Sequence, residues 1–230
     1  MPDTTVPVHL GLILDGNRRW AKEHGVSKIE GHRQGYSVLK EVTKAALDRG
    51  VKYVSAFGFS TENWSRASDE VKALLDLAYH VIAYDIKDLN KENVRVIWLG
   101  SRKHVSQKLL KAIQKAEEST KDNTRGTLAI CFNYGGQEEI LDATRKLIAE
   151  GYKPEEVTTQ VFEQALYTPE VPPVDFLIRS SGEQRISGFM LWRLAYAELY
   201  FVQKYWPDFG VNDLDEALEV FAKRQRRIGQ

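Results

Sequence analysis

One stretch near the N-terminus combines residue types that bind a divalent cation with types that bind phosphate. Asp15, Gly16 and Asn17 directly follow an apolar run, and Arg18 and Arg19 come next. A carboxylate is a hard oxygen ligand for Mg²⁺, glycine lets backbone N–H groups approach an anion, and guanidinium groups neutralise phosphate charge. The stretch therefore predicts a joint site for a cation and a phosphate. The competing interpretation is a helix capped by Asp or Asn, with solvated arginines.

A second stretch carries two arginines among hydroxyl groups. Arg179 directly follows the apolar run 174–178. Arg185 and Ser187 come next, after a flexible glycine, Gly182. Guanidinium forks and hydroxyl donors at this spacing suit a diphosphate group. The sequence thus predicts a second, separate anion site. The alternative is that both arginines form surface ion pairs, for instance with Glu183.

A third stretch, 57–66, gathers polar groups beside aromatic rings. It follows an apolar run and precedes a helix, so Ser60, Asn63 and Arg66 are expected at a strand end. Taken alone, the stretch is better explained as an ordinary turn with a packed Trp64.

A lone histidine, His32, stands between Gly31 and Gly35. By itself it is more typical of a helix start or a surface position than of a catalytic residue. Several common motifs are missing from the sequence: the dinucleotide-binding glycine loop, the Walker A lysine loop, the nucleophile elbow, the zinc-binding H-E-x-x-H pair and an aspartate-rich D-D-x-x-D box.

The elements that must position these residues follow from the spacing of apolar side chains. Short apolar runs without strict alternation predict buried parallel strands, and they fall at 9–14, 51–59, 94–99, 127–133 and 174–178. Segments with apolar residues three and four apart predict helices between them, including 69–91, 136–150, 158–166 and 212–227, the last capped by Asn212.

This alternation predicts an α/β fold with a single domain over residues 1–230 and a mostly parallel central sheet that is flanked by helices and covered on both faces. Right-handed crossovers then place the carboxyl ends of the strands along one rim, where ligands of such sheets bind. Each of the three polar stretches comes at the end of a predicted strand.

Composition narrows the function classes. Lys and Arg together number 32, as do Asp and Glu, so the formal net charge is +0. No global basic field exists to hold a nucleic acid. The single cysteine, Cys131, excludes a disulfide framework within the chain and fits a cytoplasmic setting. No run has the pattern of an export signal or a membrane span.

Taken together, the motifs resemble the cis-prenyltransferases, and they follow the order of that family over essentially the whole chain. The matching stretches are 15–21, Gly31-His32, 59–66, 133–136, 175–187, Trp192 and 197–201. The resemblance implies that an allylic diphosphate, farnesyl or geranyl diphosphate, condenses with isopentenyl diphosphate in the presence of Mg²⁺. A new cis double bond forms and inorganic diphosphate leaves.

The resemblance also implies a role for each matching residue. Asp15 would direct Mg²⁺, with Glu198 as a second candidate metal ligand. Asn63 and His32 join Asp15 as candidate catalytic residues, His32 beside the departing diphosphate. The candidate substrate-binding residues are Gly16, Asn17, Arg18, Arg19, Trp20, Lys28, Ser60, Glu62, Trp64, Arg66, Arg179, Ser181, Arg185 and Ser187.

Product length is where the sequence departs from the family pattern. Four residues replace those usual in the family: Lys28 replaces Arg, Arg18 replaces Gly, Ala67 replaces Pro and Gly188 replaces Asn. The resemblance implies that helix 69–91 lines an elongated apolar tunnel, and its length favours a product near undecaprenyl diphosphate. A short-chain, Z-farnesyl-type product is the alternative. Aromatic residues that could close a shorter tunnel are Phe57, Phe59, Tyr79, Tyr84 and Phe132.

A different class of function is a catalytically silent subunit of a heteromeric prenyltransferase. Such subunits usually lose the first acid or the arginines, whereas Asp15, Arg179 and Arg185 are all present. The resemblance further implies a homodimer, through 197–201 and a C-terminal tail Arg227-Ile228-Gly229 that reaches a neighbouring active site. A long product would require transient contact with the inner membrane leaflet.

Overall fold

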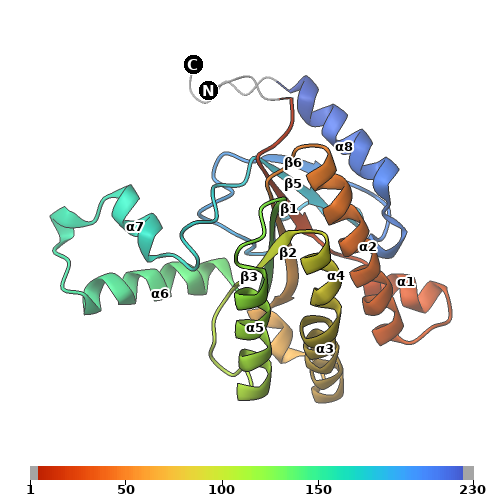
Figure 1. Ribbon diagram of the computed structural model, residues 1–230, viewed down its shortest axis with the longest axis horizontal. Helices are drawn as coiled ribbons and strands as arrows, with labels where there is room; N and C mark the ends of the chain where they lie inside the picture. Colours follow the sequence, from red (N-terminus) through yellow and green to blue (C-terminus); the bar gives the residue numbers. More distant parts are fainter. Residues whose placement is uncertain (1–4, 225–230) are drawn as a thin grey trace.

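In the computed structural model, which describes residues 5–224, strands and helices alternate along the chain (Figure 1). The strands are β1 (His9–Ile13), β2 (Tyr53–Ser60), β3 (Val94–Leu99), β4 (Gly126–Tyr134), β5 (Phe176–Arg179) and β6 (Glu198–Phe201). The helices are α1 (Asn17–Glu23), α2 (Lys28–Asp48), α3 (Ser68–His80), α4 (Ile86–Lys91), α5 (Gln107–Thr120), α6 (Gly136–Ala149), α7 (Thr159–Ala165) and α8 (Val211–Lys223).

The six strands form one parallel sheet in the order β3-β4-β2-β1-β5-β6. The chain leaves β1 toward β2 on one side and leaves β5 toward β6 on the other. The carboxyl ends of β1 and β5 therefore flank the topological switch point, which is where open α/β sheets bind ligands. This confirms the predicted α/β class and the predicted parallel sheet.

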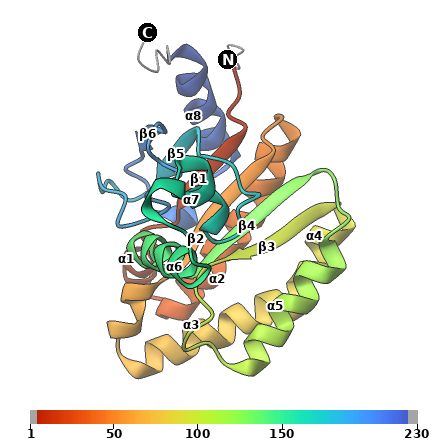
Figure 2. The same ribbon diagram turned by 90° about the vertical axis from the view of Figure 1, so that its left-hand side faces the viewer.

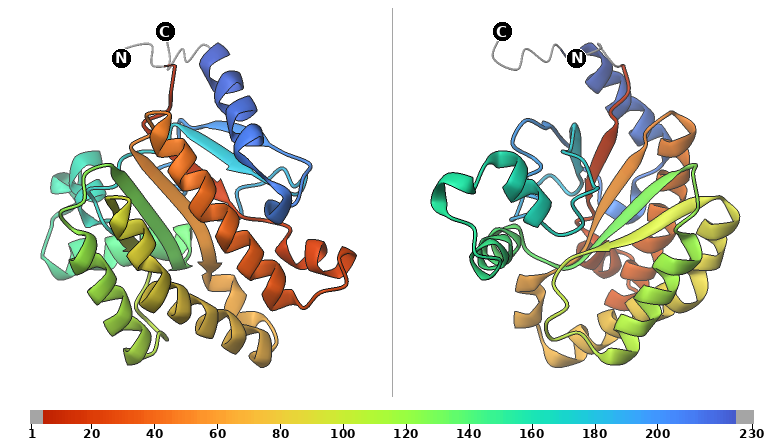
Figure 3. Two further views of the ribbon diagram at one scale, coloured as in Figure 1. Left: turned by 45° about the vertical axis from the view of Figure 1, so that its right-hand side comes forward. Right: turned by 60° about the vertical axis from the view of Figure 1, so that its left-hand side comes forward.

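The two faces of the sheet are covered differently. One face packs against α2, α3, α4, α5 and α8 around a large apolar core, and α2 crosses the middle of the sheet (Figure 3). On the other face, the loop segment 171–174 and the turns at 189–194 cover the strands. Helices α6 and α7 pack against each other and project sideways from the sheet (Figures 1 and 2). Both faces of the sheet are therefore covered, as predicted, one of them mainly by helices and the other by loops and turns.

Three elements differ from the sequence prediction. The helix predicted over 69–91 is interrupted by a π-helical turn, Val81–Asp85, between α3 and α4. Strand β6 was not predicted, because it has only four residues and is half exposed. Helix α8 is capped by Gly210 rather than by Asn212, since Asp213 accepts a hydrogen bond from the Gly210 N–H at 2.9 Å.

The end of the predicted helix 212–227 and the tail Arg227-Ile228-Gly229 lie outside the described residues. None of the helices within residues 5–224 has the length and apolar character needed to cross a membrane.

Candidate active site

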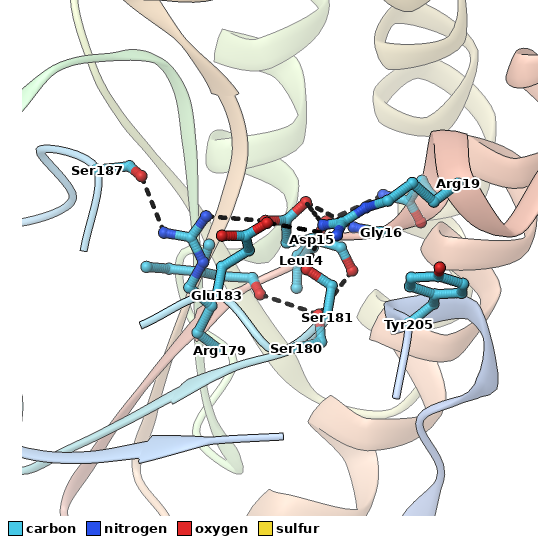
Figure 4. Close-up of polar contacts among 12 residues, drawn as sticks. Leu14, Asp15, Gly16, Arg19, Arg179, Ser180, Ser181, Glu183, Ser187 and Tyr205 are labelled. Carbon is cyan, nitrogen blue, oxygen red and sulfur yellow. Dashed lines mark hydrogen bonds and ion pairs between the residues drawn. The ribbon is translucent and has the colours of Figure 1, made fainter. Parts of the chain in front are cut away.

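An ion pair between Asp15 and Arg179 lies at the switch point of the sheet (Figure 4). Ile13 and Arg179 are register partners in β1 and β5, so Asp15, two residues beyond Ile13, comes next to the end of β5. Arg179 Nη2 donates to Asp15 Oδ2 at 2.8 Å, and the Arg179 side chain is buried. Its other terminal nitrogen donates to Ser187 Oγ at 2.9 Å. One buried guanidinium thus joins the first polar stretch of the sequence to the second.

Arg19 forms a second link between these stretches. Its Nη2 donates to Ser181 Oγ at 2.6 Å and to Asp15 Oδ1 at 3.3 Å. Glu183 accepts from Arg19 at 3.4 Å and also pairs with Arg185. The two anion sites predicted as separate are therefore one continuous cluster. Glu183 pairs with Arg185, as the structural alternative proposed, but Arg179 does not pair with it.

The electrostatics of Asp15 favour a charged carboxylate. Burial would raise its pKa, but hydrogen bonds and charges from Arg179, the Gly16 N–H and Arg19 outweigh burial and hold the pKa below its usual value. The left-handed backbone of Gly16, with φ of 102°, lets that N–H turn back to Asp15 Oδ1 at 2.7 Å. Asp15 is thus a half-exposed, ionised carboxylate at the rim.

The donor set around Asp15 fits Mg²⁺ held jointly with a diphosphate. Within residues 5–224 no group of three or more His, Cys, Asp or Glu side chains is placed to hold a metal. Mg²⁺ in proteins commonly keeps several waters and takes only one or two carboxylates plus substrate phosphate oxygens. A single carboxylate beside guanidinium groups matches that pattern.

The structure does not bring Glu198 to Asp15. Glu198 begins β6 in register with Phe176, the first residue of β5, whereas Asp15 lies beyond the carboxyl end of β1. Its carboxylate accepts from Arg224 Nη1 at 2.7 Å. Within one chain, the two residues predicted as metal ligands therefore lie toward opposite ends of the strands.

Close packing of α1 against α2 places Asn17 and His32 side by side. A Cβ atom at Gly31 would lie 2.4 Å from the Asn17 backbone oxygen, and one at Gly35 would lie 2.2 Å from Asn17 Oδ1. Only glycine fits at these positions, which explains the spacing of the short motif around His32. Asn17 Nδ2 donates to the Leu14 oxygen at 3.0 Å.

His32 lies inside α2 rather than at a helix start or on the surface. Burial, and then the nearby Arg66 charge, lower its pKa to about 4, so the imidazole is neutral at neutral pH. Its buried Nε2 and the buried Oδ1 of Asn17 have no hydrogen-bond partner among the described residues. Both residues line the same cavity.

A hydrogen bond to a residue of β4 holds the turn after β2 in place. Asn63 Oδ1 accepts from the Ser60 N–H at 3.1 Å, and Trp64 Nε1 donates to Asn133 Oδ1 at 2.7 Å. The Asn133 amide in turn donates to the backbone oxygens of Ser101 and Lys103. The third polar stretch is therefore held in place by the motif that begins at Asn133, and Trp64 is packed, as the simpler interpretation expected.

Glu70 organises the cations near the mouth of the site, and the sequence analysis missed it. Its carboxylate lies 2.9 Å from Lys28 Nζ, 3.1 Å from Arg66 Nη1 and 3.5 Å from Arg18 Nη1. Burial would raise the pKa of Glu70, but these cations lower it. A single acidic residue on the first turn of α3 belongs to no recognisable sequence motif. Its only signal was its place just after Arg66.

A cavity of about 360 Å³ opens beside these groups. Polar side chains line its mouth: Asp15, Asn17, His32, Ser60, Asn63, Arg66, Arg179 and Ser187. Its interior is apolar and lies between α2, α3 and the sheet, lined by Leu39, Phe57, Phe59, Leu74, Leu77, Ala78, Val81, Ile82, Ile130 and Phe132. The cavity thus joins a charged anion cluster to a hydrocarbon-like interior.

Some predicted site residues lie apart from this cavity. Trp20 stacks on His24 and donates through Nε1 to Asp208 at 2.7 Å, so it packs α1 against the segment after β6. Glu62 is exposed in its turn. Of the aromatic candidates for a floor, Phe57, Phe59 and Phe132 line the cavity, whereas Tyr79 and Tyr84 are not among its lining residues.

Comparison with known proteins agrees with this geometry. The family model described as putative undecaprenyl diphosphate synthase matches residues 13–229. An isoprenyl transferase of Thermotoga maritima is 48% identical over 227 residues, which cover 97% of each chain.

Among solved structures, lavandulyl diphosphate synthase from Lavandula x intermedia, crystallised in complex with dimethylallyl diphosphate, superposes with a TM-score of 0.94 at 34% identity, covering 98% of this chain and 99% of that one. A probable undecaprenyl diphosphate synthase from Campylobacter jejuni gives a TM-score of 0.83 at 26% identity, covering 97% and 99%. The anion cluster, the apolar cavity and these matches lead to one conclusion: the chain belongs to the undecaprenyl diphosphate synthase family of cis-prenyltransferases.

Proposed function

We propose that this protein condenses isopentenyl diphosphate with an allylic diphosphate to make a Z-prenyl diphosphate. The observation that carries this proposal is the single cavity with an ionised, arginine-rich mouth and an apolar interior. An allylic diphosphate has the same two parts, a charged head and a hydrocarbon tail. In the reaction, the allylic carbon–oxygen bond breaks, a carbon–carbon bond to isopentenyl diphosphate forms, and the isopentenyl unit loses a proton.

The cluster at the switch point holds the two diphosphates close together. Arg19 and Asn17 face the allylic head, while Arg179, Arg185, Ser181 and Ser187 receive the isopentenyl head. Because no protein nucleophile is needed, most of the rate enhancement would come from orientation of the two substrates and from stabilisation of charge on the leaving diphosphate.

Asp15 would hold Mg²⁺ together with diphosphate oxygens, and the ion would neutralise charge that develops on the leaving group. The half-exposed, ionised carboxylate supports this role. His32 adds a neutral hydrogen-bonding group at the same place, because its pKa of about 4 keeps it uncharged until an anion arrives.

The size of the cavity supports the short-chain alternative over an undecaprenyl product. An apolar cavity of about 150 Å³ holds benzene, which corresponds to roughly 25 Å³ per carbon. On that scale, about 360 Å³ accommodates at most about fourteen carbons, or roughly three isoprene units, because the polar mouth takes part of this volume. An undecaprenyl chain is several times longer.

The proposal is tested by incubating the purified protein with labelled isopentenyl diphosphate and, in turn, dimethylallyl, geranyl and farnesyl diphosphate. We expect label to enter an allylic product with at least one of these primers, and expect EDTA to abolish the reaction. Consumption of no primer at saturating Mg²⁺ would contradict the proposal and would favour the catalytically silent subunit.

A further inference from the structure

Tyr36 stands in the wall between two hollows. It lies on α2 one turn after His32 and therefore on the same helix face, farther from the anion cluster. On one side it lines the apolar cavity. On the other side it lines a hollow of about 600 Å³ between α2 and α3, which we call the outer groove and which also includes Ile29, Arg33, Lys40, His80 and Asp85.

Only a thin layer of side chains separates these two hollows. Leu77 and Val81 join Tyr36 as residues that line both. Leu77 belongs to α3, and Val81 begins the π-helical turn that follows it. A π-helical turn widens the helix locally and is often found at functional sites. The aromatic ring of Tyr36 is the largest of the three side chains, so it contributes most to the closure.

The Tyr36 side chain is not explained by polar contacts. Its hydroxyl is buried and has no hydrogen-bond partner within residues 5–224. Burial, with Asp85 and then Asp88 nearby, raises the pKa of the phenol, so it stays neutral. Lys40 Nζ lies 5.4 Å from the ring centroid on the groove side. Burying an unpaired hydroxyl is unfavourable, so the ring must be kept here for the space that it fills.

Behind the opposite wall of the cavity there is almost no free space. Ile82, Ile130 and Phe132 separate the cavity from an inner void of only about 20 Å³. Phe132 is stacked on Phe59 with ring centroids 5.1 Å apart, and it packs edge-on to Trp98. A chain that outgrew the cavity would therefore find room toward the outer groove and almost none toward the sheet.

We propose that Tyr36 sets the product length of this enzyme by closing the apolar cavity toward the outer groove. This inference rests on the proposed prenyl elongation. The ring stops the growing chain at the length that the cavity holds, and its removal connects the cavity to the space between α2 and α3.

The test compares the dephosphorylated products of wild-type protein, Tyr36→Ala and Tyr36→Phe at high isopentenyl diphosphate. We expect Tyr36→Ala to lengthen the main product by about two or more isoprene units, because about 600 Å³ of groove becomes reachable. Tyr36→Phe should keep the wild-type length, since the ring and not the hydroxyl closes the wall. A Tyr36→Ala variant that condenses isopentenyl diphosphate yet stops at the wild-type length would overturn the inference.

Two controls separate the possible causes. Ile29→Ala changes the outer groove without touching the cavity wall and should leave product length unchanged. Phe132→Ala opens only the small inner void and should lengthen the product less than Tyr36→Ala does. An equal or larger shift from Phe132→Ala would place the stop at the sheet and contradict the inference.

Unfolding of a variant and failure of the proposed function can each be told apart from failure of the inference about Tyr36. If circular dichroism shows that Tyr36→Ala is unfolded, Tyr36→Leu keeps an apolar side chain on α2 while removing the outer part of the ring, and it carries the same expectation. If the wild-type protein itself condenses nothing, the proposed function fails. If the wild type elongates and the folded variants keep its product length, only the role of Tyr36 fails.

Discussion

At the residue scale, the account depends on Asp15 and on the guanidinium groups around it. Removing the carboxylate removes the oxygen ligand that we propose for the metal, so Asp15→Ala should lower turnover about a hundredfold or more. Steady-state kinetics at saturating Mg²⁺ measure this. Asp15→Asn keeps the shape of the side chain and serves as a matched variant, and Asp48→Ala, which removes an exposed partner of Arg125, should leave turnover unchanged. Near-normal turnover in both Asp15 variants would contradict the role.

The two arginines that we propose to bind the isopentenyl diphosphate head should behave differently. Arg185 is exposed and pairs only with Glu183 among the contacts described, so Arg185→Ala should raise the KM of isopentenyl diphosphate far more than that of the primer. Arg179 is buried between Asp15 and Ser187, so Arg179→Ala should impair the use of both substrates. Initial rates with each substrate varied in turn give the two KM values. An equal rise of both KM values in Arg185→Ala would count against the assignment.

Sequence motifs were enough to identify site residues whose side-chain type alone indicates what they bind. Asp15, Arg19, Arg179 and Ser187 meet at the rim because parallel strands deliver them there. The residues that were missed, Glu70 and Tyr36, are single side chains on amphipathic helices. Their importance comes from what faces them in space, and neighbours in space have no signature in one sequence.

At the scale of elements, His9 ties β1 to its surroundings. Its Nδ1 donates to the Pro172 oxygen at 2.8 Å and its Nε2 accepts from Ser55 Oγ at 2.7 Å. Burial lowers the pKa of His9 to about 4, as it also does for His32. The folded protein therefore binds fewer protons than the unfolded chain between pH 6.5 and 4.

Stability should accordingly be full above pH 6.5 and fall as the pH drops to about 4, by about 3 kcal/mol for a fully buried histidine such as His9. Urea unfolding at a series of pH values measures the free energy of unfolding. His9→Asn should be less stable at pH 7.5 but should lose less on acidification. A wild-type unfolding free energy that stays constant over this window would refute the expectation.

Element prediction succeeded where the pattern was strong. Strands β1 to β5 match buried apolar runs, with ends that differ by at most two residues. The pattern failed for β6, which is an edge strand with an exposed face, and at Val81–Asp85, where the apolar spacing continues smoothly through a π-helical turn. Period alone does not reveal an extra residue in a helical turn.

At the scale of the whole molecule, β6 is an edge strand with exposed apolar side chains. Leu199 is 38% exposed, and Tyr196 just before the strand is 79% exposed. Open edges and exposed apolar groups favour pairing with another chain. We expect a homodimer at micromolar concentration in sedimentation equilibrium, and expect Leu199→Lys to weaken it. A stable, active wild-type monomer would be the contrary result.

The most direct test of the central claim is the chemical structure of the product. Wild-type protein is given Mg²⁺, an allylic diphosphate primer and labelled isopentenyl diphosphate, and the dephosphorylated product is examined by mass spectrometry and NMR. The account predicts a prenyl alcohol of short chain whose newly formed double bond is cis. A product whose new double bond is trans, or no carbon–carbon condensation with any primer, would contradict it.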